Sequence, residues 1–166
     1  MTAARQQRKR YYAGVAAALG LLLALAAVPR APQAATTERI VVDWHTGLAI
    51  DGYDPVAFYT DGKPLLGSPD FELPYGGAVW RFRNPGNRAA FAARPDVYMP
   101  QFGGYDPVGI AHGVAVAGSP RAWLISGGRL YLFYDRDRLN AFIANTQRIM
   151  AAAERKWPQV ERTLSP

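Results

Sequence analysis

The chain has 166 residues, a length that favours one domain with a sizeable buried core. Its net charge of +6 suggests nucleic acid at first sight, but five of the 19 Lys and Arg residues lie in the first thirty positions. From Ala35 onward 14 basic residues face 13 acidic ones. This near balance argues against a nucleic-acid partner.

The first 34 residues have the pattern of a signal peptide or an N-terminal anchor. A basic stretch, RQQRKR, precedes an apolar run over residues 13–28, and small residues and prolines follow. The run is short for a membrane span, so we expect export, to the periplasm or beyond. An uncleaved segment would anchor the protein in the inner membrane, as its only membrane contact. The chain contains no cysteine, which excludes disulfides and a lipoprotein attachment site.

Residues 35–51 are predicted to form a linker and an N-terminal strand, with RIVVDW as the strand. Residues 52–166 follow as one domain made of two internal repeats, 52–103 and 104–158. The GYDPV run that opens the first repeat at Gly52 returns at Gly104. The Gly-Ser-Pro, Gly-Gly and phenylalanine positions of the two copies also coincide once one gap is placed opposite Tyr59. A period of about fifty residues is typical of a repeated structural unit.

Each copy predicts the same order of elements. The Asp-Pro pair is typical of a helix start, with Asp as N-cap and Pro at the first helical position. Two apolar segments around a Gly-Gly pair indicate a β-hairpin. The strands are expected over residues 71–75 and 78–82 in the first copy, and over residues 122–126 and 129–134 in the second. The glycines supply the positive φ angles that a tight turn needs.

A helix is expected after each hairpin. The first should run from about Asn87 to Arg94, because Pro95 disfavours helical geometry in the residue before it. In the second copy, apolar residues at a spacing of three and four from Leu139 to Trp157 predict one long helix that ends at Pro158. The predicted fold class is α+β: two tandem turn–hairpin–helix units related by a pseudo-twofold, with an antiparallel sheet and packed helices.

The stretch GLAIDGYDPVAFYTDGKPLLGSPDFELPYGGAVWRFRNPGNRAAFAARPDVYMPQFGGY, with the later GRLYLFY and RKWPQV, resembles the exported stand-alone members of the YHS-domain family. The resemblance covers about residues 46–158. It implies a small envelope protein, and metal binding is commonly inferred for this family. Many relatives read GGYCA where this chain reads GGYDP, so Asp106 occupies the position of their cysteine. An oxygen ligand in place of a thiolate argues against soft metals.

Four residues of the two GYDPV runs are candidate ligand-binding residues. Asp54 and Asp106 would lie near the pseudo-axis, where two carboxylates can share a proton or a cation. Capping of a helix start is the stronger explanation of both residues. Tyr53 and Tyr105 either line a cleft between the copies or fill the core.

His112 is the fifth candidate, at the end of the second short helix. A metal site would have to use His45, His112, Met99, Met150 or carboxylates, with His45, His112 and Asp106 as the candidates and copper or another transition metal as the ion, although their spacing is not that of a known ligand motif. His45 fits a surface or packing role as well. A hydrolase triad of Ser119, His112 and Asp106 can be written down, but it lacks the G-x-S-x-G context. We therefore assign no catalytic residue.

The sequence favours an exported YHS-like binding protein that handles a metal ion or a small ligand, or that binds an envelope protein. A structural or protein-interaction module without a ligand is the alternative. A hydrolase or acid–base enzyme is the third hypothesis.

Overall fold

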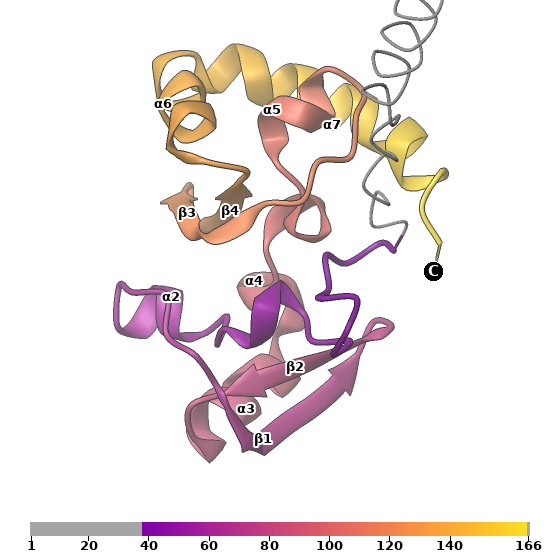
Figure 1. The fold of residues 1–166 in the computed structure, drawn as a ribbon. Coiled ribbons are helices and arrows are strands. Elements are labelled where there is room, and N and C mark those ends of the chain that lie inside the picture. Colours follow the sequence, from indigo (N-terminus) through magenta and orange to yellow (C-terminus); the bar gives the residue numbers. More distant parts are fainter. Residues whose placement is uncertain (1–37, 166) are drawn as a thin grey trace, which may run out of the picture. The chain divides into compact units, whose positions relative to one another are not determined.

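The computed structural model describes residues 38–165 (Figure 1). The segment 1–34, which the sequence predicts to be a signal peptide or an N-terminal anchor, and its apolar run 13–28 lie outside the described residues. Within 38–165, no helix is long and apolar enough to cross a bilayer. The described residues form an α+β domain of two antiparallel hairpins, each followed by helices that pack on it. The predicted fold class is confirmed at this level.

The two repeats contain the same succession of elements, and in the structure each begins slightly before its predicted bound, at Ile50 and at Gln101. The first repeat comprises η1 (Ile50–Gly52), α2 (Ala57–Thr60), β1 (Ser68–Tyr75), β2 (Ala78–Phe82), α3 (Pro85–Ala93) and α4 (Pro95–Tyr98). The second comprises η2 (Gln101–Gly104), α5 (Pro107–Ala111), β3 (Ser119–Ser126), β4 (Arg129–Phe133), α6 (Arg136–Ala144) and α7 (Thr146–Glu161). Each hairpin is a separate two-stranded sheet.

Backbone hydrogen bonds repeat along with the elements. The amide of Asp54 donates to the carbonyl of Leu65, and in the second copy the amide of Asp106 donates to Val116, both at 2.8 Å. Both hairpins also have an irregular register in the same place, after Ser68 in β1 and after Ser119 in β3. The sequence repeat is therefore a repeat of local backbone structure.

Two expected elements differ from the structure. The RIVVDW segment does not form a regular strand: Val42 makes an isolated β-bridge with Ala49, and Glu38, just before the segment, makes one with Ser165. The long C-terminal helix is divided at Asn145, whose φ of −141° is not helical, into α6 and α7. Pro158 lies inside α7 and does not end it. Val160, beyond the proline, is buried in the core, and this packing offsets the hydrogen bond that proline cannot make.

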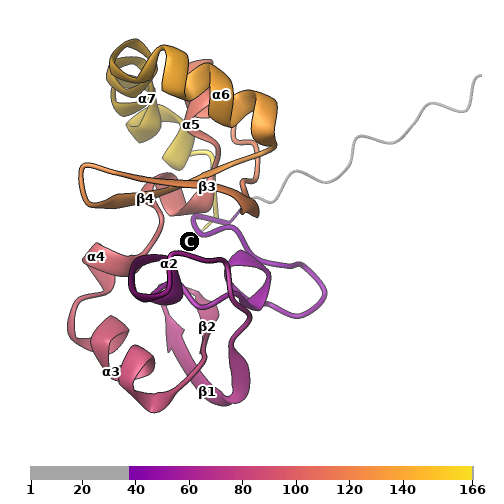
Figure 2. The ribbon, with the colours of Figure 1, turned by 90° about the vertical axis from the view of Figure 1, so that its left-hand side faces the viewer.

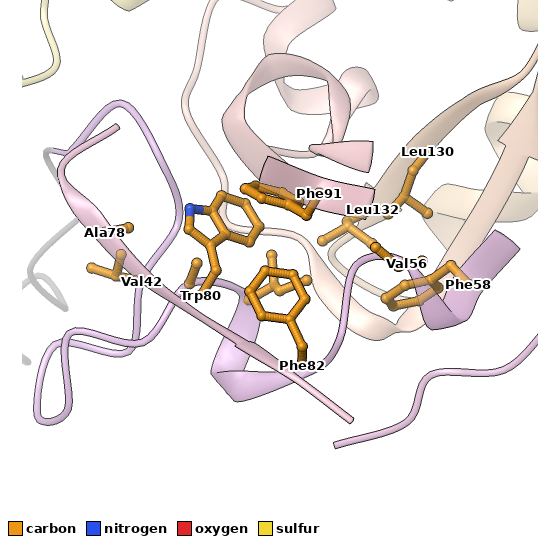
Figure 3. Packing of buried hydrophobic residues seen from close by; sticks show 11 residues of the cluster. Val42, Val56, Phe58, Ala78, Trp80, Phe82, Phe91, Leu130 and Leu132 are labelled. Atoms are coloured by element: carbon orange, nitrogen blue, oxygen red, sulfur yellow. The ribbon is translucent and has the colours of Figure 1, made fainter. Parts of the chain in front are cut away.

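The core of the first repeat includes side chains of the second (Figure 3). Leu130 and Leu132 of β4 pack there with Trp80, Phe82 and Phe91. The alternate residues of β4, Tyr131 and Phe133, belong to another cluster, which contains residues of α6 and α7. Because successive side chains of a strand point to opposite faces, hairpin β3–β4 lies between the first repeat and its own helices (Figure 2).

Candidate functional site

Asp54 is fully buried and has hydrogen-bond donors at both carboxylate oxygens. Oδ1 accepts from the amides of Val56, at 2.8 Å, and Ala57, at 3.3 Å. Oδ2 accepts from the amide of Arg83, at 2.8 Å, and from Nδ2 of Asn87, at 2.6 Å. The carboxylate thus joins the GYDPV turn to the end of β2 and to α3. This full complement of donors explains the residue as a structural cap.

Asp106 occupies the same place in the second repeat with fewer donors. It is also fully buried, and its Oδ1 accepts from the amide of Val108 at 2.9 Å, as the N-cap of α5. Oδ2 has no hydrogen-bond partner in the described structure, and Nη1 of Arg138 lies 3.7 Å from it. Burial raises the pKa of Asp106, although the Val108 amide and the Arg138 charge oppose the shift.

The hydrogen-bond and ion-pair partners of the two carboxylates come from separate repeats. Asp54 is held by groups of the first repeat, and Asp106 by Val108 and Arg138 of the second. The predicted N-capping is present at Asp106, where Pro107 is the first residue of α5. In the first copy the same carboxylate bonds precede α2, which begins two residues later than the sequence suggested.

The two tyrosines that precede these aspartates have different surroundings. Tyr105 is fully buried, packs near Trp157 of α7 and donates its hydroxyl hydrogen to the carbonyl of Glu38. Tyr53 is half-buried, and its hydroxyl accepts a long hydrogen bond of 3.5 Å from Nε of Arg121. Of the two predicted roles, Tyr105 has the core role and Tyr53 the cleft role.

Tyr53 lines an open groove of about 470 Å³ at the junction of the repeats. The first repeat contributes Asp51, Tyr53 and Leu66, and the second contributes the start of β3 through Ser119, Pro120 and Arg121. An isolated antiparallel bridge between Tyr53 and Leu66 fixes these two side by side. Leu66 is 62% exposed, an unusual state for leucine that leaves an apolar wall in the groove.

Asp51 lies at the groove in a strained backbone conformation. Its φ of 54° and ψ of 26° are in the left-handed region, between Ile50 at φ 45° and Gly52 at φ 75°. Such conformations cost about 1–3 kcal/mol at residues other than glycine and are frequent at functional sites. Partial burial raises the pKa of the Asp51 carboxyl, the nearby Asp43 raises it further, and Arg121 opposes the shift.

Arg121 supplies positive charge to the groove. Its hydrogen bond to the Tyr53 hydroxyl raises the pKa of the guanidinium, which therefore stays charged. Because that bond uses Nε, the Nη groups keep their donors for a ligand. The Ser119 hydroxyl accepts from the Arg121 amide at 3.3 Å and retains its own hydrogen as a donor. The groove can therefore hold a small anionic group.

Comparisons with known proteins are negative. No family model, curated protein or solved structure matches this chain. The YHS-domain resemblance remains an expectation from the sequence.

His112 lines a different, smaller groove. It is exposed at the C-cap of α5, and Gly113 and four residues in and after α7, including Lys156, line about 240 Å³ with it. His45 is exposed on a turn, where its Nδ1 lies 3.8 Å from Oδ1 of Asp43 and its ring stacks on Trp44. The described residues contain no group of three His, Cys, Asp or Glu side chains that could hold a metal ion.

The three residues of the hypothetical hydrolase triad lie in three different environments. Ser119 lines the groove with Tyr53, His112 lines the groove beside α7, and Asp106 is buried. A nucleophile and its base must lie within hydrogen-bond reach of each other. This arrangement offers no geometric support for the triad.

Sequence reasoning missed Asp51, Leu66 and Arg121. A signal for two of them was present in the repeat itself, because Asp51 aligns with Gly103 and Arg121 aligns with Asp70. Positions where two copies of one unit differ in charge mark places where their environments differ. Leu66 gives no such signal, because its exposure depends on how the repeats pack.

Proposed function

We propose that this protein is an exported, non-enzymatic binding protein, and that its ligand is a small molecule with a carboxylate group. The observation that carries the proposal is the groove between the repeats. Within it, the Arg121 guanidinium and the hydroxyls of Tyr53 and Ser119 adjoin the exposed Leu66. A few polar groups beside an apolar wall are typical of a small-molecule site.

The size and construction of the groove support a small ligand. A volume of about 470 Å³ is within the usual range of about 300–1,000 Å³ for such sites. The Tyr53–Leu66 bridge and the pairing of Ser119 with Phe133 hold three of the six lining residues in place. Arg121 recognises a carboxylate through parallel N–H donors, which gives direction as well as attraction.

The direct test is calorimetric titration of the mature protein with butyrate, leucine and N-acetylleucine. We expect at least one of these carboxylates to bind, and we expect Arg121→Ala to weaken that binding at least tenfold. Arg88→Ala is the matched control, because Arg88 is an exposed arginine on α3 that does not line the groove. It should bind like the wild type.

Tyr53→Phe tests the contribution of the hydroxyl to binding separately from that of the ring. Removal of the hydroxyl takes away the acceptor for Nε of Arg121, so we expect several-fold weaker binding with little change in folding. If none of the carboxylates binds, or if Arg121→Ala and Arg88→Ala bind equally well, the proposal is wrong.

A protein-interaction module is the second candidate. The observation in its favour is Trp44, which is 77% exposed on the turn that also carries His45. Exposed tryptophan is enriched among residues that dominate protein interfaces. This candidate predicts an envelope-extract partner that wild-type protein captures and Trp44→Ala does not. Tyr134→Ala is the control, because Tyr134 is a similarly exposed aromatic residue, at 60%.

A further inference from the structure

We propose that the groove selects a zwitterion, an α-amino acid with an apolar side chain, by placing its ammonium group at Asp51 and its carboxylate at Arg121. This inference rests on the proposed function and names the ligand class. It is carried by the charges at the groove, the difference between the repeats at Asp51, and the apolar wall.

The groove has an acidic side. Asp51 lines it, and Asp43 is close enough for the two carboxylates to affect each other electrostatically. Asp43 accepts hydrogen bonds from the amides of His45 and Thr46, which hold its negative charge in place. Two neighbouring carboxylates attract a cation more strongly than either alone.

The opposite charge in the groove belongs to Arg121, and it does not close on Asp51. The ion pairs of the described residues are His45–Asp43, Arg81–Glu72 and Arg138–Asp106. Asp51 and Arg121 thus line one groove with opposite charges and no direct pair between them. A molecule that carries both charges can pair with both residues. A simple anion leaves Asp51 unpaired and is repelled by its carboxylate.

The second repeat shows why Asp51 is informative. Its counterpart there is Gly103, and a Cβ at that position would lie 1.9 Å from the carbonyl oxygen of Arg39, so only glycine fits. The first repeat has no such steric requirement at Asp51, yet the backbone keeps the left-handed geometry that glycine adopts most easily. Aspartate is among the few residues other than glycine that adopt this geometry readily, so the two repeats share the backbone conformation and differ in the charge that only the first one carries.

The apolar wall favours a hydrocarbon side chain on the ligand. Leu66 and Pro120 line the groove together with its charged residues. When the leucine side chain of a ligand packs against this wall, the apolar area removed from water contributes to the free energy of binding. Both charges of an α-amino acid sit next to the same carbon, so its side chain has one direction left in which to extend.

Calorimetry with three related probes tests the inference. Leucine carries both charges, N-acetylleucine carries only the carboxylate, and leucinamide carries only the ammonium group. We expect leucine to bind the wild-type protein at least tenfold more tightly than either analogue. Asp51→Asn should remove the preference for leucine over N-acetylleucine, and Asp137→Asn, an exposed control on α6, should leave it unchanged.

The outcomes separate this inference from the proposed function. If N-acetylleucine binds as tightly as leucine in an Arg121-dependent way, the zwitterion inference is overturned and the carboxylate site stands. If leucinamide binds as tightly as leucine, recognition rests on the acidic side alone, and both are overturned. If none of the probes binds, both are also overturned.

Discussion

Asp54 and Asp106 occupy equivalent positions in the two repeats, but their charges are compensated by different means. Asp54 is surrounded by neutral donors, with Asn87 and the Arg83 amide at its second oxygen. Asp106 has Arg138 at the position that aligns with Asn87, and the guanidinium stays 3.7 Å from a carboxylate oxygen that no hydrogen bond satisfies. Four hydrogen bonds stabilise the first charge, whereas the second has the hydrogen bond from the Val108 amide and a more distant positive charge.

The difference shows how a repeat can conserve its architecture while its copies change. Both aspartates accept a hydrogen bond from the amide two residues further on, which shapes the turn, and the contacts of the second carboxylate oxygen differ. The same holds at the surface, where Tyr105 is covered by the chain's own segments and Tyr53 borders the open groove. We therefore expect substitution of Asp54 to lower the stability of the protein strongly. The contribution of Asp106 to stability should depend on pH.

The largest effect is expected for Asp54→Ala. The substitution removes a cap and leaves the Arg83 amide and the Asn87 side chain without their acceptor. We expect the free energy of unfolding to fall by about 3–5 kcal/mol, the sum of a cap and two unsatisfied donors. Urea denaturation measures it. Asp106→Ala should cost only about 1–2 kcal/mol, and an equal loss at both positions would contradict the comparison.

Arg138→Ala comes next. It leaves the buried Asp106 carboxylate without its nearest positive charge, and we expect a loss of about 1–2 kcal/mol near pH 7. This is less than for a fully buried pair, because Arg138 is partly exposed and its distance is long. Arg138→Asn, which copies the first repeat, should recover part of the loss. Arg136→Ala, an exposed neighbour on α6, is the control.

The pH dependence of stability follows from the raised pKa of Asp106. The folded protein binds this proton more tightly than the unfolded chain, whose carboxyl has a pKa near 3.8. The stabilisation is therefore fully present below pH 3.8 and is lost as the pH rises through the folded pKa. Asp106→Asn cannot titrate, so wild-type stability relative to this variant should fall over that interval. A stability difference between the wild type and Asp106→Asn that does not change with pH would contradict the raised pKa.

The smallest effect is expected for Asp51→Gly, which gives the first repeat the residue of the second. Glycine relieves the left-handed strain but increases the freedom of the unfolded chain. We expect a net gain of about 0.5 kcal/mol in the free energy of unfolding, together with loss of the leucine preference. Thermal denaturation measures the first effect. A clear destabilisation would mean that Asp51 has a structural role.

Much of the fold could be predicted because local sequence signals indicate its elements and occur in both repeats. Gly76-Gly77 and Gly127-Gly128 mark both hairpin turns, and β2 has the predicted bounds. The C-terminal helices could not be predicted correctly, because the division at Asn145 and the helical geometry around Pro158 depend on packing of distant residues. Local preference is a weak guide where tertiary contacts decide.

The candidate site was predicted only in part. Tyr53 was among the expected cleft residues, but the groove also needs Arg121 and Leu66, which have no motif of their own. Their importance depends on the junction between the repeats, and a local sequence pattern does not encode it. Asp54 and Asp106 were recognised as special, and their hydrogen bonds support the capping interpretation that the Asp-Pro pattern already favoured.

The central claim is that a ligand binds beside Asp51 and Tyr53, in the groove that Arg121 of β3 completes, whereas the equivalent position at Tyr105 is covered by the chain itself. Amide chemical shifts recorded during titration with leucine test it most directly. We predict saturable changes at Asp51, Tyr53 and Arg121 and none at the counterparts Gly103 and Tyr105. Changes confined to the surroundings of Gly103 and Tyr105, or no saturable change at Tyr53 and Arg121, would contradict the claim.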